Sequence, residues 1–212
     1  MFFYFTGNPF PDPALADKDG LLAAGGDLSV ETLLKAYYNG IFPWFNPEDP
    51  VLWWSPNPRM VLFLDKFKVS KSLRKSLREG GFSVTFNQCF EEVIKQCSAV
   101  SRKGQKGTWI TEEMLASYVK LHRQGYAVSV ECWKNQQLVG GLYGVDLKDK
   151  KIFGGESMFH TETDASKVAL YFLVEKLRKE NYKLIDCQVY TKHLASLGAE
   201  EIPREEFLKF LK

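Results

Sequence analysis

The sequence is poor in the residues that build disulfides and zinc sites. Its 212 residues include four cysteines, and none of them forms a Cys-x-x-Cys pair or stands at ligand spacing from one of the three histidines. A disulfide framework and a metal centre are therefore not expected. Reduced, mostly buried thiols are typical of the cytoplasm, which is where we expect this protein to act.

Long apolar runs and a strong charge of either sign are also missing. No apolar run reaches about 18 residues, so the sequence predicts no membrane-spanning helix. The apolar start, residues 1–9, lacks the basic segment of a signal peptide and is too short for one. The formal net charge is +2, so any contact with nucleic acid has to come from local basic patches.

The remaining composition is that of a globular protein, with 45% hydrophobic residues and 14% aromatic ones. Prolines and aromatics crowd into residues 1–62, which we interpret as a small N-terminal α/β domain. Residues 63–212 follow the order of an N-acyltransferase (GNAT-type) domain: an antiparallel meander at 126–159, a helix at 165–179, and a strand at 184–188. The predicted class is α+β, with a mostly antiparallel sheet flanked by helices.

The linker before the long helix tests the acyltransferase analogy. Users of acetyl-coenzyme A in this architecture need a glycine-rich loop there, whose backbone N–H groups hold a pyrophosphate. Residues 157–164 contain no glycine and two acids, Glu162 and Asp164. We expect these acids to repel a pyrophosphate, so the acyl donor should be something other than coenzyme A.

A carboxylate and an amide stand two residues apart on the predicted strand 184–188. Side chains two apart on a strand point to the same face, so Asp186 and Gln188 are expected side by side, with Ile185 and Cys187 opposite. Polar groups on an apolar strand are costly unless they are hydrogen-bonded or functional. The pair is either a satisfied structural pair or part of a site.

Two basic segments are candidates for binding phosphates. A helix capped by Ser70 carries four cations on one side, and residues 101–107 form a glycine-containing basic loop. Each is also explained as an ordinary solvated surface. The cations are Lys71, Arg74, Lys75 and Arg78 on the helix, and Arg102, Lys103 and Lys106 in the loop.

Nine segments, in order and over nearly the whole chain, resemble those of the bacterial leucyl/phenylalanyl-tRNA–protein transferases. Each motif alone is modest, and together they are highly specific. They are 20–28 (GLLAAGGDL), 40–44 (GIFPW), 52–56 (LWWSP), 108–110 (TWI), 138–145 (LVGGLYGV), 155–159 (GESMF), 165–167 (ASK), 184–188 (LIDCQ) and 193–199 (HLASLGA).

The resemblance implies an aminoacyltransferase that needs no metal or nucleotide cofactor. Such an enzyme moves Leu or Phe, and Met less well, from aminoacyl-tRNA to proteins with N-terminal Lys or Arg, marking them for degradation by the N-end rule. It implies a relay of Gln188 and Asp186 that orients and deprotonates the acceptor amine, with Trp44 and Trp109 near the terminal adenosine of the tRNA. Trp109 is equally explained as a buried anchor at a helix start. We expect a monomer.

Chemical reasoning adds roles for further residues. An amide oxygen is a poor base, so Asp186 is the better proton acceptor and Gln188 the better positioning group. Glu156 is expected to hold the ammonium or the basic side chain of the acceptor. An unbranched apolar acyl side chain needs an apolar pocket, for which we predict Phe153, Met158, Leu170, Phe172 and Ile185.

Two other functions compete with this prediction. The order of elements alone allows a coenzyme A-dependent N-acetyltransferase, which the acidic linker disfavours. The basic helix and loop alone allow an RNA-binding module without catalysis, which would bind tRNA whether or not it is aminoacylated.

Overall fold

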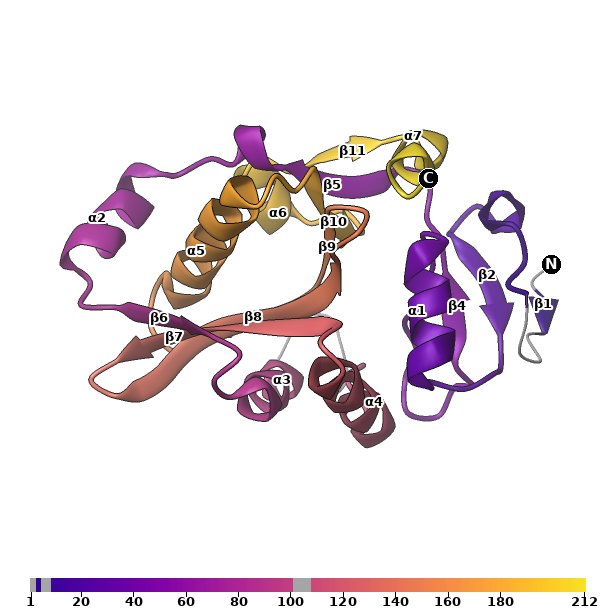
Figure 1. The fold of residues 1–212 in the computed structure, drawn as a ribbon, viewed down its shortest axis with the longest axis horizontal. Coiled ribbons are helices and arrows are strands. Elements are labelled where there is room, and N and C mark those ends of the chain that lie inside the picture. Colours follow the sequence, from indigo (N-terminus) through magenta and orange to yellow (C-terminus); the bar gives the residue numbers. More distant parts are fainter. Residues whose placement is uncertain (1–2, 5–8, 101–107) are drawn as a thin grey trace.

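The computed structural model describes residues 3–4, 9–100 and 108–212, which form two sheets with helices around them (Figure 1). The predicted basic loop with Arg102, Lys103 and Lys106 lies outside the described residues. The helices are α1 Val30–Tyr38, α2 Lys71–Glu79, α3 Phe90–Ala99, α4 Glu112–Arg123, α5 Ala165–Lys179, α6 Lys192–Ser196 and α7 Arg204–Phe210, with 3-10 turns at Pro13–Leu15 and Leu64–Lys66.

The N-terminal part is a four-stranded sheet covered by α1. Its strand order is β1-β2-β4-β3, with β1 (Phe3–Tyr4) parallel to β2 (Leu21–Ala24) and the other neighbours antiparallel. The remaining strands are β3 (Phe42–Pro43) and β4 (Leu52–Trp54). Helix α1 starts where Ser29 accepts a hydrogen bond from the Thr32 N–H at 3.2 Å, and the chain leaves it through Gly40 at φ +72°.

The larger sheet has seven strands in the order β11-β5-β10-β9-β8-β7-β6. Neighbouring strands are antiparallel except β9 and β10, which run parallel because α5 crosses over between them. The strands are β5 Arg59–Phe63, β6 Ser83–Phe86, β7 Ala127–Lys134, β8 Gln137–Leu147, β9 Ile152–His160, β10 Leu184–Gln188 and β11 Glu200–Ile202.

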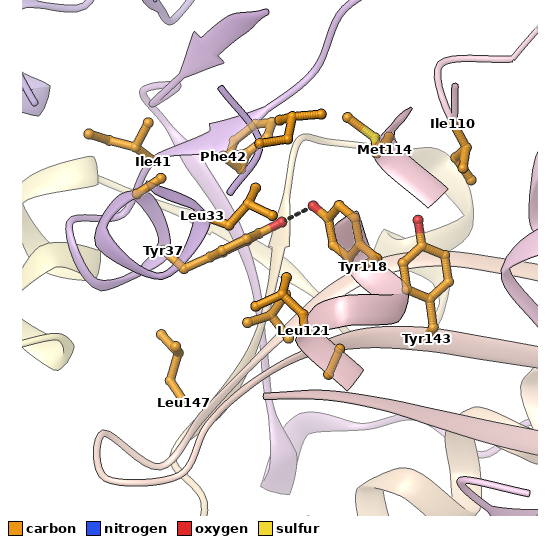
Figure 2. Close-up of a cluster of buried hydrophobic side chains, with 14 of the residues drawn as sticks. Leu33, Tyr37, Ile41, Phe42, Ile110, Met114, Tyr118, Leu121, Tyr143 and Leu147 are labelled. Carbon is orange, nitrogen blue, oxygen red and sulfur yellow. Dashed lines mark hydrogen bonds between the residues drawn. The ribbon is translucent and has the colours of Figure 1, made fainter. Parts of the chain in front are cut away.

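The two faces of this sheet carry two cores because side chains alternate along each strand. Leu142 packs into the core under α5, whereas its neighbour Tyr143 packs into the core with α3 and α4. The second core continues into the N-terminal part through Leu33 and Tyr37 of α1, which meet Tyr118 of α4 (Figure 2). The two sheets therefore share one apolar interior.

The predicted α+β class, with a small N-terminal α/β part and a mostly antiparallel sheet flanked by helices, is confirmed. The helices and strands predicted after residue 62 are present with ends shifted by a few residues. Strand β5 begins at Arg59 and lies in the larger sheet, so the chain passes from one sheet to the other between Trp54 and Arg59. Short strands β2, β3, β4 and β11 were not predicted.

Within the described parts of the chain, no helix is long and apolar enough to cross a membrane. The same residues contain no group of three or more His, Cys, Asp or Glu side chains arranged to hold a metal ion.

Candidate active site

A cavity of about 530 Å³ opens along the middle of β9 and the end of β10, under α5 and α6 and beside the β3 segment. Most of its wall is apolar, and a carboxylate, Glu156, and an amide, Gln188, lie in that wall. A concave apolar site with a few convergent polar groups is the usual form of a binding or active site.

Gln188 reaches this cavity because the backbone turns at the end of β10. Its φ is +64°, a left-handed conformation that non-glycine residues rarely adopt, and the pairing of β10 with β5 shifts register between Asp186 and Gln188. Gln188 therefore lines the cavity together with Ile185 and Cys187. This corrects the prediction that Asp186 and Gln188 share a face, because strict alternation holds only for a regular strand.

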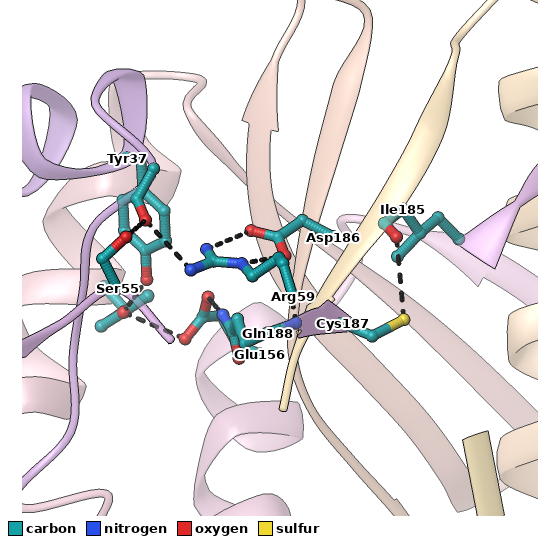
Figure 3. A network of polar contacts seen from close by, with 10 residues as sticks. Tyr37, Ser55, Arg59, Glu156, Ile185, Asp186, Cys187 and Gln188 are labelled. Carbon is teal, nitrogen blue, oxygen red and sulfur yellow. Dashed lines mark hydrogen bonds and ion pairs between the residues drawn. The ribbon is translucent and has the colours of Figure 1, made fainter. Parts of the chain in front are cut away.

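Asp186 lies behind the cavity wall and is not among the described residues that line it. Its carboxylate makes a two-point ion pair with Arg59: Nε donates to Oδ1 at 2.8 Å and Nη2 to Oδ2 at 2.7 Å. The backbone N–H of Gln188 also donates to Asp186 Oδ1, at 3.0 Å. The side chains of Arg59 and Asp186 are 1% and 5% exposed, so the pair is shielded from water (Figure 3).

Glu156, on β9, is the carboxylate that faces the cavity. Its Oε1 accepts a hydrogen bond from Gln188 Nε2 at 2.8 Å, and its Oε2 accepts one from the Tyr118 hydroxyl at 3.1 Å. The Tyr118 hydroxyl in turn shares a hydrogen bond with that of Tyr37 (Figure 2). Three elements, α1, α4 and β10, thus fix this one carboxyl group.

Burial raises the pKa of Glu156 to about 7, against the lowering effect of the hydrogen bonds from Tyr37, Tyr118 and Gln188. Burial also raises the pKa of both tyrosines well above the ordinary value, so they remain neutral donors at pH 7. A carboxyl group with a pKa near 7 exchanges protons readily at physiological pH, as a general base or acid does.

Four of the five residues predicted to form an apolar pocket do line the cavity: Phe153, Met158, Leu170 and Ile185. Phe172 does not line the cavity: it is 41% exposed, and its ring contacts that of Tyr171 edge to face. Successive residues of an α-helix are about 100° apart, so Phe172 lies about 200° around α5 from Leu170. The inward positions of α5 at the cavity are Leu170 and Leu173.

Both predicted tryptophans also line the cavity. Trp44 is 38% exposed and lies against Trp54, with 5.6 Å between ring centroids. Trp109, just before α4, is 9% exposed and packs in the core shared by the two sheets. It is therefore a buried anchor near a helix start and a cavity residue at once.

The three histidines have different surroundings. His122 stacks on Phe90 at 4.3 Å, and His160 is exposed at the end of β9. His193 lines the cavity from α6, and burial lowers its pKa, with Lys167 and His160 adding to the effect. His193 is an exposed residue that also lines the cavity.

The basic helix α2 is separate from the cavity. Lys71, Arg74, Lys75 and Arg78 are all exposed, and α2 lies at the end of the molecule opposite the N-terminal sheet (Figure 1). These four side chains can meet a large anionic partner at its surface, and they are not cavity residues.

The two acids of the linker before α5 are paired in the structure. Glu162 Oε2 lies 3.2 Å from Lys134 Nζ, and Asp164 Oδ1 accepts a hydrogen bond from Lys167 Nζ at 2.8 Å. Asp164 also accepts one from the Ser76 hydroxyl at 3.0 Å. Their charges are largely compensated, so the predicted repulsion of a pyrophosphate is weaker than the sequence suggested.

In the polar network around Glu156 and Asp186, sequence reasoning missed Arg59, Tyr37 and Tyr118. Arg59 had a signal, since a cation at the start of a buried strand requires a buried anion. No sequence signal marked Tyr37 and Tyr118, because each occupies an ordinary apolar position of its helix, α1 or α4.

Comparison with known proteins identifies the family. Residues 61–212 match the family model of the leucyl/phenylalanyl-tRNA protein transferases, and residues 26–57 match the model of the N-terminal domain of the same transferases. The chain therefore belongs to the leucyl/phenylalanyl-tRNA protein transferase family, a class of aminoacyltransferases.

Relatives over the full length agree. A leucyl/phenylalanyl-tRNA–protein transferase of Christiangramia forsetii is 59% identical over 211 residues, covering 100% of both chains. One of Flavobacterium johnsoniae is 54% identical, covering 100% of this chain and 99% of its own. The activity is that of a leucyl/phenylalanyl-tRNA–protein transferase, which uses aminoacyl-tRNA and acceptor proteins and serves the N-end rule.

Solved structures are more distant. The structure of L-PGS from Bacillus licheniformis is similar over 82% of this chain and 57% of its own, with a TM-score of 0.43 and 12% identity. A GCN5-related N-acetyltransferase from Kribbella flavida is similar over 79% of this chain and 59% of its own, with a TM-score of 0.39 and 9% identity.

Proposed function

We propose that the transfer ends on the α-amine of proteins whose N-terminal residue is lysine or arginine, and that methionyl groups are accepted less well than leucyl and phenylalanyl groups. The observation that supports this is the apolar cavity with a single carboxylate–amide pair, Glu156 and Gln188, in its wall. The negative charge of ionised Glu156 favours an acceptor that carries cations.

The acyl side chain occupies the apolar part of the cavity, against Phe153, Met158, Leu170 and Ile185. All four residues line it, and the flexible methionine adapts to side chains of different shape. A pocket of this kind separates apolar side chains by only about 1–3 kcal/mol per methylene. That weak discrimination fits the use of both leucine and phenylalanine.

The tRNA contacts the protein in two places. Its terminal adenosine stacks on Trp44 and Trp109, since aromatic side chains commonly hold unpaired bases. Its backbone follows the exposed cations of α2, with the loop cations Arg102, Lys103 and Lys106 as further contacts. The α2 cations are Lys71, Arg74, Lys75 and Arg78.

In the chemical step the acceptor nitrogen bonds to the ester carbonyl carbon, and the bond from that carbon to the ribose oxygen breaks. The α-ammonium, with a pKa of about 8, must first lose a proton. We assign the proton to Glu156, whose pKa is about 7 and whose carboxylate faces the cavity. Gln188 orients the amine. After the attack the nitrogen loses a second proton, which passes to the leaving ribose oxygen and makes it a hydroxyl.

Asp186 has a different part in this proposal from the one expected. Its oxygens are engaged by Arg59 and the Gln188 N–H, and it lies behind the wall. It supports Gln188 and is not the base. We further infer that the protein works as a monomer in the cytoplasm, where charged tRNA is available; light scattering of the purified chain tests the first point.

The test is a transfer assay with radiolabelled Leu-tRNA and four peptides that differ only in the first residue: Arg, Lys, Ala or Glu. Label is expected in the Arg and Lys peptides and not in the other two. Equal labelling of all four would contradict the acceptor proposal. Free leucine with uncharged tRNA serves as the control for background incorporation.

A further inference from the structure

Arg59 is the most completely enclosed charged residue of the site. Its side chain is 1% exposed, and its guanidinium lies between the rings of Phe42 and Phe207, at 4.9 and 4.6 Å from their centroids. All three nitrogens donate: two to the carboxylate of Asp186 and Nη1 to the carbonyl of Gly40 at 3.0 Å. These contacts fix the orientation of the guanidinium group (Figure 3).

Asp186 connects Arg59 to Gln188, which lies two residues further along the chain. Its Oδ1 accepts both the Nε–H of Arg59 and the backbone N–H of Gln188, at 2.8 and 3.0 Å. At Gln188 the φ of +64° is unfavourable for a residue with a Cβ, so it persists only where the surroundings impose it. The hydrogen bond to Asp186 restrains that strained residue directly.

We propose that Arg59 is a positioning residue for the transfer reaction: through Asp186 it holds Gln188 in the left-handed conformation that turns its side chain into the cavity. The inference rests on the proposed role of Gln188 in orienting the acceptor amine. Arg59 does not touch the cavity and acts only through this chain of contacts.

The geometry also explains why an arginine is needed. A guanidinium is a planar fork that holds both oxygens of a carboxylate and a third acceptor at once, whereas a lysine ammonium is a point charge on a flexible stem. Arg59→Lys therefore keeps the buried charge and loosens the placement of Asp186. The Gly40 carbonyl keeps a donor in this variant, because the Ser55 hydroxyl also donates to it at 3.2 Å.

The experiment measures kcat, KM for Leu-tRNA and the thermal midpoint of four chains: wild type, Arg59→Lys, Gln188→Ala and the double variant. We expect Arg59→Lys to lower kcat at least tenfold and to change KM less than threefold. We expect the double variant to have the kcat of Gln188→Ala alone, because residues that act in one chain of contacts give non-additive effects.

Arg204→Lys is the matched control. Arg204 also joins the C-terminal region to the N-terminal part, with Nη1 donating to the Ser55 carbonyl at 2.6 Å, and it makes no contact with Asp186. Its kcat is expected within twofold of wild type even if its thermal midpoint falls. A merely structural role for Arg59 would give the two lysine variants the same kinetics.

The outcomes separate the two proposals. Wild-type kcat in Gln188→Ala would overturn the proposed role of Gln188. A large loss there, with wild-type kcat in Arg59→Lys or with losses that multiply in the double variant, would overturn the role of Arg59 alone. A matched pH profile adds a second check: Arg59→Lys should lower kcat at every pH without moving the midpoint of the acid limb.

A second variant covers the case in which Arg59→Lys does not fold. Asp186→Glu keeps the ion pair but moves the carboxylate by one methylene, away from the Gln188 N–H. The proposal predicts a loss of kcat in this variant that again does not add to that of Gln188→Ala. Wild-type kcat in Asp186→Glu would overturn it.

Discussion

In the proposed function, the cavity wall and helix α2 contact the same substrate, aminoacyl-tRNA, in opposite ways. In the wall, Glu156 is fixed by Gln188 and Tyr118 and surrounded by apolar side chains. On α2, exposed cations lie along a helix whose surface faces water. Charges in the first setting are little affected by salt, and those in the second are screened over about 8 Å at physiological ionic strength. The wall should therefore govern the rate of the chemical step, and α2 the capture of tRNA.

The largest effect is expected for Glu156→Gln, which changes the cavity wall and leaves α2 intact. The variant keeps the shape of the side chain and removes the proton acceptor, so we expect kcat to fall by about 10² to 10³. KM for Leu-tRNA should change less than threefold, since none of the proposed tRNA contacts uses this carboxylate. Single-turnover transfer to an Arg-initiated peptide measures the step, and a kcat within threefold of wild type would exclude Glu156 as the base.

The role of α2 in capturing tRNA is tested by replacing its four exposed cations by alanine. These are Lys71, Arg74, Lys75 and Arg78. Each lost phosphate contact should lower the slope of log binding constant against log salt by about one. We expect KM for Leu-tRNA to rise at least tenfold at low salt, with kcat within twofold. An unchanged salt slope would show that the tRNA follows another surface.

The pH dependence sharpens the assignment of the base. Because the pKa of Glu156 is raised to about 7, its carboxylate form is lost as the pH falls through 7. We expect kcat to fall about tenfold per pH unit below that value. Initial rates measured between pH 5.5 and 8.5 test this. The acid limb with its midpoint near 7 should be missing from the residual activity of Glu156→Gln, which leaves only the titration of the acceptor amine.

The smallest effects concern the acyl pocket, where two residues on opposite sides of α5, Leu170 and Phe172, form a matched pair. Leu170→Ala enlarges the cavity and should change the ratio of Phe to Leu transfer several-fold, in favour of Phe. Phe172→Ala should leave both rates within twofold, because the side chain faces solvent. Competition between Leu-tRNA and Phe-tRNA measures the ratio, and an effect of Phe172 as large as that of Leu170 would reject the assigned lining.

Much of the fold followed from local patterns. The helix caps Ser29, Ser70 and Thr111 each accept the hydrogen bond that a start of a helix requires. The long strands β7, β8 and β9 correspond to the antiparallel meander predicted at 126–159. The strands β2, β3 and β4 did not, because two to four residues among prolines and aromatics are too few to establish a period.

The site was harder to predict because its key residues depart from regular geometry. The segment 184–188 was correctly identified as a strand with polar residues, but the turn at Gln188 separates it from Asp186. Likewise, the apolar pattern of α5 selected both Leu170 and Phe172 when only one faces the cavity. What a sequence pattern cannot contain is the partner from another element, here Arg59 for Asp186 and Tyr118 for Glu156.

The ion pair of Arg59 and Asp186 joins residues that are 127 positions apart, and Phe207 of α7 packs on it from still later in the chain. During synthesis on the ribosome, Arg59 emerges long before its partners. A nascent chain can therefore complete the first sheet and several helices while the reaction centre is still unformed. Incomplete translation products should bind tRNA through α2 without transferring an amino acid, and would compete with the finished enzyme for its substrate.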